Sequence, residues 1–314
     1  MDKNKRKSMI KVRGGFSEKI GLSTCTIKMQ TNEFDDRTRT LIGNHLYDVL
    51  SVVFSYASTI GISRYLNPSR QTPLQAMSSD FCKDILSEVL NVSVHLPSNK
   101  FYNWEVNYDR FAEIISSAPY NEVLDFLWYV CHWIATHTTS TSFVHEIYNG
   151  FNQLFEKEYV GYRFIAGEIV PITDKSESAE IEQACLIPFD GACTQLQKAL
   201  GFLSDREHPD YKNCVKESIS AVESVCKVIS GNEKAALKDA INGLIANGMN
   251  IHGSLKSAIL ALYGYASDEG GIRHAERETE STVTFEEAKF MMVTCSAIVN
   301  YLVAEYGKHG AGNA

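Results

Sequence analysis

The chain lacks the short motifs by which several large enzyme classes are recognised. It contains no GxxxxGK[ST] or GxGxxG phosphate loop and no GxSxG nucleophile elbow. NTPase, dinucleotide-binding and hydrolase functions are therefore unsupported. A two-metal nuclease needs several converging carboxylates, and the adjacent pair Asp268 and Glu269 would point in different directions. The sequence predicts no metal and no other cofactor.

Paired metal-binding cysteines are also missing. The eight cysteines form no CxxC pair, and His132 and His137 are five residues apart, so they would not share a helix face. Three of the cysteines, Cys214, Cys226 and Cys295, fall on the apolar faces of predicted helices, where a free cysteine packs as a small hydrophobic residue. We therefore expect reduced, structural thiols and no disulfides.

Long apolar runs are absent too, so no membrane span or secretory signal is expected, and a cytoplasmic location is predicted. The formal charge is −8, but residues 1–13 hold six basic side chains and one acidic one. The remainder carries 24 basic and 37 acidic residues, a balance of −13. An acidic body disfavours general binding to nucleic-acid phosphates, and no DNA partner is expected. The basic arm is interpreted as a disordered tail.

What the sequence does contain is helical periodicity, and the predicted fold class is mainly α. In the first half, apolar residues recur at helical spacing over residues 41–56, 81–90, 108–115, 123–134 and 143–155. Asp35 and Asp36 are N-cap candidates for the first of these helices. The many aromatic side chains in this half are interpreted as core.

A short β-hairpin is predicted from strands at 162–165 and 169–172 around Ala166-Gly167-Glu168, with Pro171 marking an edge strand. A polar stretch, 173–182, then leads into the second half. The expected domains are a flexible arm (1–15), an N-terminal helical domain (16–160), a hairpin and linker (161–175), a helical bundle (176–308) and a disordered tail (309–314).

Four helices are predicted to form the C-terminal bundle. The first follows Pro209 and spans 211–229, the next two lie at 237–245 and 255–263, and Gly248 ends the second. The last begins at Thr284, and Glu287 three residues later completes a capping box.

The segment 262–276, LYGYASDEGGIRHAE, is the most informative one for function. Gly270-Gly271 allows a sharp turn that would present Asp268, Glu269, Arg273 and His274 together. Arg matches phosphate geometry and His titrates near neutrality, which predicts a site acting on phosphate. The alternative is a helix C-cap followed by a solvated loop with an Asp–Arg ion pair.

Several segments together resemble AbiJ-type abortive-infection proteins. FSEKIGL (16–22) and DDRTRTLIGNHLYDVL (35–50) resemble one of that family's N-terminal domains. YRFIAGEIVPIT, the helix at 208–231, LYGYASDEGGIRHAE and FEEAKFMMVTCSAIVNYL resemble its C-terminal part. The resemblance implies a bacterial phage-resistance protein whose C-terminal bundle is similar to HEPN domains.

HEPN domains are commonly dimeric, and many are metal-independent ribonucleases. The resemblance therefore implies a homodimer that cleaves RNA (tRNA or mRNA) at the subunit interface, with His as general acid-base and Arg against the phosphate. The implied catalytic residues are Arg273, His274 and Asp268. The supporting or RNA-binding residues are Lys216, Glu223, Glu269, Tyr263 and Tyr265.

One departure keeps a second function open. The usual HEPN pattern separates Arg from His by four to six residues, whereas Arg273 directly precedes His274. A literal match, Arg39 to His45, falls in the other half, where both residues are interpreted as surface or partly packed. The alternatives are a non-catalytic sensor or binding module using the same cluster, and an antitoxin-like or structural partner.

Overall fold

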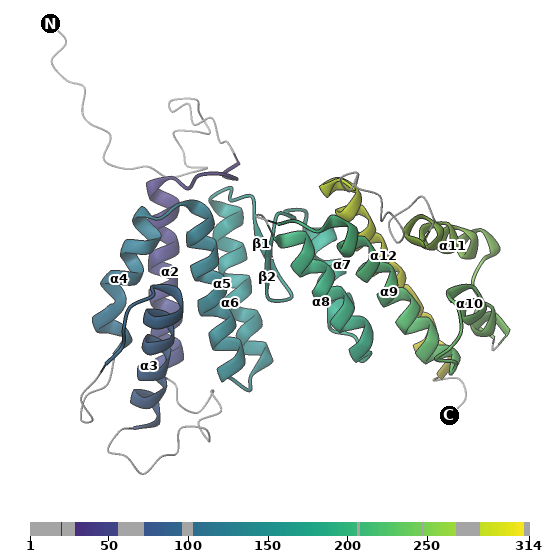
Figure 1. Ribbon diagram of the computed structural model, residues 1–314, viewed down its shortest axis with the longest axis horizontal. Coiled ribbons are helices and arrows are strands. Elements are labelled where there is room, and N and C mark those ends of the chain that lie inside the picture. The colour runs from purple at the N-terminus through teal and green to yellow at the C-terminus, as the bar shows by residue number, and fades with distance from the viewer. Residues whose placement is uncertain are drawn as a thin grey trace, which may run out of the picture. The chain divides into compact units, whose positions relative to one another are not determined.

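The computed structural model describes residues 20, 29–55, 72–95, 103–205, 208–246, 248–267 and 283–310 (Figure 1). The chain divides into two compact units, Met1–Tyr162 and Arg163–Ala314. Both units are mainly helical, which confirms the prediction of a mainly α fold. Each unit is described by itself.

The first unit is a set of helices arranged around the central helix α2. Its elements are α2 (Asp36–Ser55), α3 (Pro73–Asp84), a π-helical turn η2 (Ile85–Val89), α4 (Trp104–Ser117), α5 (Tyr120–His137) and α6 (Thr141–Lys157). Helix α2 packs against α3, α4 and α6, and α5 packs against both α4 and α6. The predicted helices of this half are confirmed, and most are a turn longer than expected.

Side-chain caps fix where these helices begin. Asp35 Oδ1 accepts the backbone N–H of Thr38 at 2.8 Å, which confirms the predicted cap of α2. Thr72 forms a capping box with Gln75 at the start of α3. These bonds satisfy backbone donors that the first helical turn leaves unpaired.

The core of the first unit is aromatic, as predicted. Phe81, Phe111, Phe126 and Phe151 are fully or almost fully buried. Phe81 meets Trp133 edge-to-face with ring centroids 5.1 Å apart. Such contacts add stabilisation beyond the burial of area, so these rings serve packing.

A buried polar network ties residues 30–38 to the end of α6. Glu158 is fully buried and accepts hydrogen bonds from Arg37 Nε at 3.0 Å and Arg37 Nη2 at 3.1 Å. Gln30 Nε2 donates to the Glu158 carbonyl at 2.7 Å and to Thr38 Oγ1 at 2.8 Å. Gln30 also forms a parallel β-bridge with Val160. A buried carboxylate requires such compensation, because desolvating a charge is costly.

The second unit opens with the predicted hairpin. Strands β1 (Arg163–Ile165) and β2 (Glu168–Val170) pair antiparallel. Ala166 and Gly167 have φ values of 49° and 94°, and two consecutive positive φ values are what a two-residue type I′ turn needs. Strand β2 ends one residue before Pro171, which cannot donate to a ladder.

The described residues after the hairpin form the helices α7 (Lys175–Cys185), α8 (Asp190–Ser204), α9 (Tyr211–Ser230), α10 (Leu237–Ala246), α11 (Gly253–Ser267) and α12 (Phe285–Gly310). Helices α7, α8, α9 and α12 pack on one another, while α10 and α11 pack against α9. The sequence prediction omitted α7 and α8, and it assigned residues 173–182 to a polar connection. Helix α9 begins at Tyr211, as predicted, with Asp210 as its N-cap.

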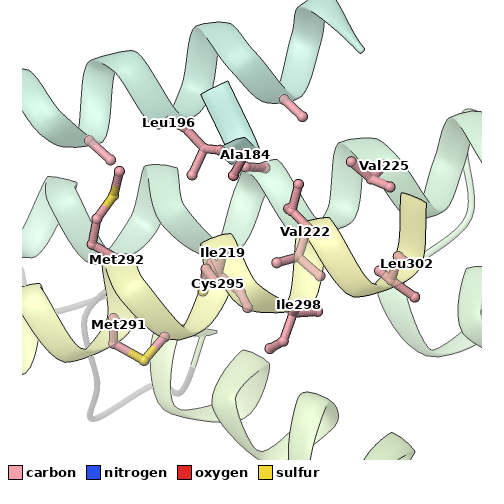
Figure 2. Packing of buried hydrophobic residues seen from close by; sticks show 14 of the residues in the cluster. Ala184, Leu196, Ile219, Val222, Val225, Met291, Met292, Cys295, Ile298 and Leu302 are labelled. Atoms are coloured by element: carbon pink, nitrogen blue, oxygen red, sulfur yellow. The ribbon is translucent and has the colours of Figure 1, made fainter. Parts of the chain in front are cut away.

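The core of this unit lies among α7, α8, α9 and α12. Figure 2 shows Ala184 of α7 and Leu196 of α8 near the α9 and α12 side chains, where Ile219 lies close to Cys295. The buried cysteines Cys214, Cys226 and Cys295 are free. Burial raises the pKa of Cys214 and Cys226 to about 12, so these thiols stay protonated and inert at neutral pH. Their predicted packing role is confirmed.

Helix α12 is long as well as apolar. Among the described helices, Phe285–Lys308 alone has the length and composition to cross a membrane. The core helix of a soluble protein meets the same two criteria. Met292, Cys295 and Val299 of α12 are fully buried in this unit.

Candidate functional site

Helices α9 and α12 run parallel, and this sets which residues lie at the same end of the bundle. Tyr211 meets Phe285 edge-to-face at 6.0 Å, and Ser218 Oγ lies 3.4 Å from Met292 Sδ. The two helices therefore advance together, so their first turns lie side by side.

The first turn of α12 is also close to the last turn of α11. Tyr265 lies two residues before the end of α11, and Glu287 carries the capping box of α12. Burial, and then the nearby Glu287 carboxylate, raise the pKa of Tyr265. Thr284 Oγ1 accepts the Glu287 N–H at 3.2 Å, and Glu287 Oε2 accepts the Thr284 N–H at 2.9 Å. The predicted capping box is confirmed, and the Glu287 carboxylate in it also acts electrostatically on Tyr265 of α11.

The predicted reactive residues belong to that connecting segment. Asp268, Glu269, Arg273 and His274 lie outside the described residues. Of the two predicted tyrosines, Tyr263 is partly buried against the core and Tyr265 is 40% exposed.

The two predicted supporting residues on α9, Lys216 and Glu223, lie at different positions along the helix axis. Lys216 lies between Cys214, whose Sγ is 4.0 Å from the Ala288 carbonyl, and Ser218. It is thus level with the second turn of α12. Glu223 follows seven residues later on the same face, roughly 10 Å farther along α9 at 1.5 Å per residue. Both side chains are partly buried. Lys216 is therefore the nearer of the two to the end of the bundle where the segment begins and ends.

In the first unit, Arg39 and His45, which match the HEPN spacing of Arg and His, have structural roles. Arg39 Nε donates to the Phe34 carbonyl at 3.0 Å, and Arg39 Nη1 donates to the carbonyls of Ile115 and Ala118 at 2.8 Å each. Arg39 thus caps the C-terminus of α4, where a cation also opposes the helix dipole. Sequence periodicity carries no signal for this role, because the carbonyls come from residues 76 and 79 positions away.

His45, the other residue of that match, is packed against neighbouring side chains and is not placed for catalysis. Its ring meets Phe151 edge-to-face at 4.7 Å. Burial lowers the pKa of His45, with Asp48 opposing the shift. The Nε2 atom is buried and has no hydrogen-bond partner among the described residues. Arg39 and His45 are both partly buried, as expected from the sequence.

Within the ranges that the structure describes, no group of three or more His, Cys, Asp or Glu side chains is arranged to hold a metal ion.

The family model for AbiJ N-terminal domain 4 matches residues 14–186, which is more than half of the chain. The chain belongs to the AbiJ family. Comparison with curated proteins and with solved structures gives no match.

The AbiJ match covers two of the segments that carried the N-terminal resemblance, 16–22 and 35–50, together with the hairpin segment. It extends through the first unit, the hairpin and α7. AbiJ membership associates the chain with abortive infection, a defence against phage. The helices from α8 onward lie outside the matched residues.

Proposed function

We propose that this AbiJ-family chain is an abortive-infection effector that cleaves RNA without a metal, through Arg273, His274 and Asp268 in a HEPN-like C-terminal bundle. The observation that carries the defence role is the AbiJ match over residues 14–186. The nuclease activity rests on the chemistry of the Arg-His segment and on the described helices that flank it.

The described frame supports a phosphate site at this end of the bundle. The Glu287 carboxylate at the start of α12 acts electrostatically on Tyr265 near the end of α11. Lys216 is level with the second turn of α12, and none of the ion pairs among the described residues includes it. At that level of the bundle, Lys216 would add positive charge to a site that binds an RNA phosphate.

The proposed reaction needs only side chains and the RNA itself. His274 removes the proton from a ribose 2′-OH, and the resulting oxyanion attacks the adjacent phosphorus. The O2′–P bond forms and the P–O5′ bond breaks, which leaves a 2′,3′-cyclic phosphate. A second, protonated His supplies the proton that the 5′-oxygen takes up. Arg273 stabilises the charge on the phosphorane, and Asp268 orients the pair. In a homodimer, the second His would come from the other subunit.

The test is cleavage of tRNA and single-stranded RNA by the full chain in EDTA. We expect a cyclic-phosphate product that His274→Ala and Arg273→Ala each remove. His208→Ala is the matched control, because His208 is an exposed histidine of the same unit. Cleavage that does not exceed the His274→Ala background rejects the nuclease.

A binding module is the second candidate, and the adjacency of Arg273 and His274 favours it. On an ideal helix, neighbouring side chains diverge by about 100°. Arg273 and His274 would then contact a ligand from two sides and would not both reach one phosphate group. This function predicts that Arg273→Ala abolishes phage protection while no RNA product accumulates. An antitoxin-like partner instead predicts an obligate heteromer, and purification of a homodimer alone counts against it.

A further inference from the structure

A groove on the first unit has the size and the polar groups of a small-molecule site. It lies between α2 and α4 and encloses about 370 Å³, within the range of ligand pockets in proteins. Its walls are one face of each helix. From α2 come Asp36, Arg39, Thr40, Gly43 and Asn44, and from α4 come Tyr108, Ala112, Ile115 and Ser116.

The two helices run antiparallel along the groove, which orders the chemistry from one end to the other. Arg39 reaches Ile115 near the end of α4, whereas Gly43 accepts the Tyr108 hydroxyl seven residues earlier in α4. Asp36 therefore lies at one end, Arg39 follows about one turn later, and Asn44 lies at the other end. Eight residues of helix separate Asp36 from Asn44, a length of roughly 12 Å.

The Arg39 guanidinium is fixed by three hydrogen bonds, and its Nη2 edge takes part in none of them. A guanidinium has five N–H donors. Three of those on Arg39 are directed to the carbonyls of Phe34, Ile115 and Ala118. Nη2 donates to no atom of the described residues, and no carboxylate there pairs with the side chain. The three carbonyl contacts fix the orientation of the guanidinium, so a ligand would meet a preorganised cation and lose little entropy.

Asp36 supplies the opposite charge in the same groove. It is exposed in the first turn of α2, three residues before Arg39 on the same face. Residues at this spacing are close enough to form an ion pair, yet Arg39 instead reaches across to α4. Among the described residues, these two opposite charges about one turn apart thus have no ion-pair partner. Thr40 Oγ1 donates to the Asp36 backbone carbonyl and not to the Asp36 carboxylate.

The rest of the groove suits an uncharged organic body between those two charges. Gly43 leaves a gap in the wall of α2, because a Cβ there would meet only the Tyr108 hydroxyl oxygen, at 3.7 Å. Ala112 and Ile115 add apolar surface, while the exposed Asn44 amide offers one further donor and acceptor.

We propose that this groove binds a small amphoteric molecule, with an oxyanion against Arg39 Nη2 and an N–H donor or ammonium against Asp36. Amino acids and nucleoside monophosphates share this chemistry. The site lies in the N-terminal unit and is independent of the Arg-His segment, so it would give the AbiJ-family domain a ligand of its own.

The test measures binding to the full-length protein by ligand-observed NMR and calorimetry. The probes are γ-aminobutyrate, glutamine, AMP and GMP, with acetate and inorganic phosphate as ligands that carry an anion alone. We expect at least one amphoteric probe to bind, and the carboxylate and phosphate groups of probes will show which oxyanion the site accepts.

Three variants locate any binding that is found. Gly43→Leu fills the gap and should weaken binding at least tenfold. Asp36→Asn removes a negative charge without disrupting a described side-chain contact, and it should weaken the binding of the amphoteric probes. Glu113→Gln neutralises an exposed carboxylate of α4 that does not line the groove, and it should change nothing. Gly43→Ala keeps the test valid if leucine disturbs folding, since its Cβ fits at 3.7 Å and alanine favours a helix.

Three results would overturn the proposal. The first is no binding by any probe at about 10 mM, a concentration that detects even millimolar dissociation constants. The second is binding that the Gly43 variants leave unchanged. The third is acetate or phosphate binding as tightly as the amphoteric probes, which would leave Asp36 without a role.

Discussion

Gly150 of α6 lies against the His45 ring of α2, and a double-mutant cycle at these two positions tests how closely the helices pack. A Cβ on Gly150 would lie 2.6 Å from His45 Nε2 and 2.8 Å from Cε1. Contacts between heavy atoms are most favourable at about 3.5–4.0 Å. The substitution Gly150→Ala therefore forces the imidazole to move away from its edge-to-face contact with Phe151.

The expected free energies follow from two opposing effects. Replacing glycine by alanine within a helix stabilises it by about 1 kcal/mol. Displacing the ring costs about 0.5–1.5 kcal/mol for a strained rotamer. Losing the Phe151 contact costs a further 0.5–1.5 kcal/mol or so. Gly150→Ala should thus lower the free energy of unfolding by up to about 2 kcal/mol. In a His45→Ala background the same change should raise it by about 1 kcal/mol.

Urea unfolding followed by tryptophan fluorescence is the appropriate assay, because Trp104, Trp128 and Trp133 all lie in the first unit. The control is Gly43→Ala on the same helix as His45, where the added methyl meets nothing closer than 3.7 Å. We expect this control to stabilise the unit. If Gly150→Ala stabilises both backgrounds equally, the coupling energy is zero and the packing argument is refuted.

Three further changes test other features. Glu158→Ala should lower the free energy of unfolding of the first unit by about 2–4 kcal/mol, since it removes the buried carboxylate that accepts two hydrogen bonds from Arg37; an unchanged urea midpoint would contradict this. The pKa of His45 is lowered in the folded state, so stability should fall as the pH drops below the unfolded value of about 6.5 and level off below the folded pKa. His45→Ala should remove that loss, and equal pH dependence in both proteins between pH 7.5 and 5.5 would argue against it. Asp174→Ala removes the acceptor of the Ser176 and Glu177 N–H groups and should destabilise α7 by about 1 kcal/mol; amide hydrogen exchange in α7 that does not accelerate would refute it.

The sequence predicted those parts of the fold that local signals specify. The Thr284–Glu287 capping box, the hairpin at Ala166-Gly167 and the end of α10 before Gly248 all depend on residues within a few positions of each other. Periodic apolar residues likewise predicted α2, α4, α5 and α6. Local chemistry and tertiary structure agree at these places.

Helices α7 and α8 were missed because their local signals are weak. Helix α7 buries only Ile181, Ala184 and Cys185, and the polar remainder looks like a linker. Helix α8 has no side-chain cap at its start, and small alanines make up part of its buried face. Helix α7 is instead determined by its packing against α12 and α8, and α8 by its packing against α9.

The same division applies to the candidate sites. The sequence singled out Arg39 through its spacing to His45, but it could not predict that the guanidinium caps α4. The α2–α4 groove depends on two helix faces more than 60 residues apart, which no local motif describes. The segments 162–173, 208–231, 262–276 and 285–302 resembled the C-terminal part of AbiJ-type proteins from the sequence. The family match, over residues 14–186, includes only the first of them.

The parallel course of α9 and α12 has a consequence for how this chain can be shortened. Parallel neighbours cannot be joined by a tight loop, because the chain must travel back along the whole of α9 before α12 can start. Helix α9 has 20 residues and is therefore about 30 Å long. Helices α10 and α11 supply this return path. A deletion that replaced the whole connection 231–284 with fewer than about nine extended residues could not span this length. Helix α12 would then have to reverse its direction or leave the bundle.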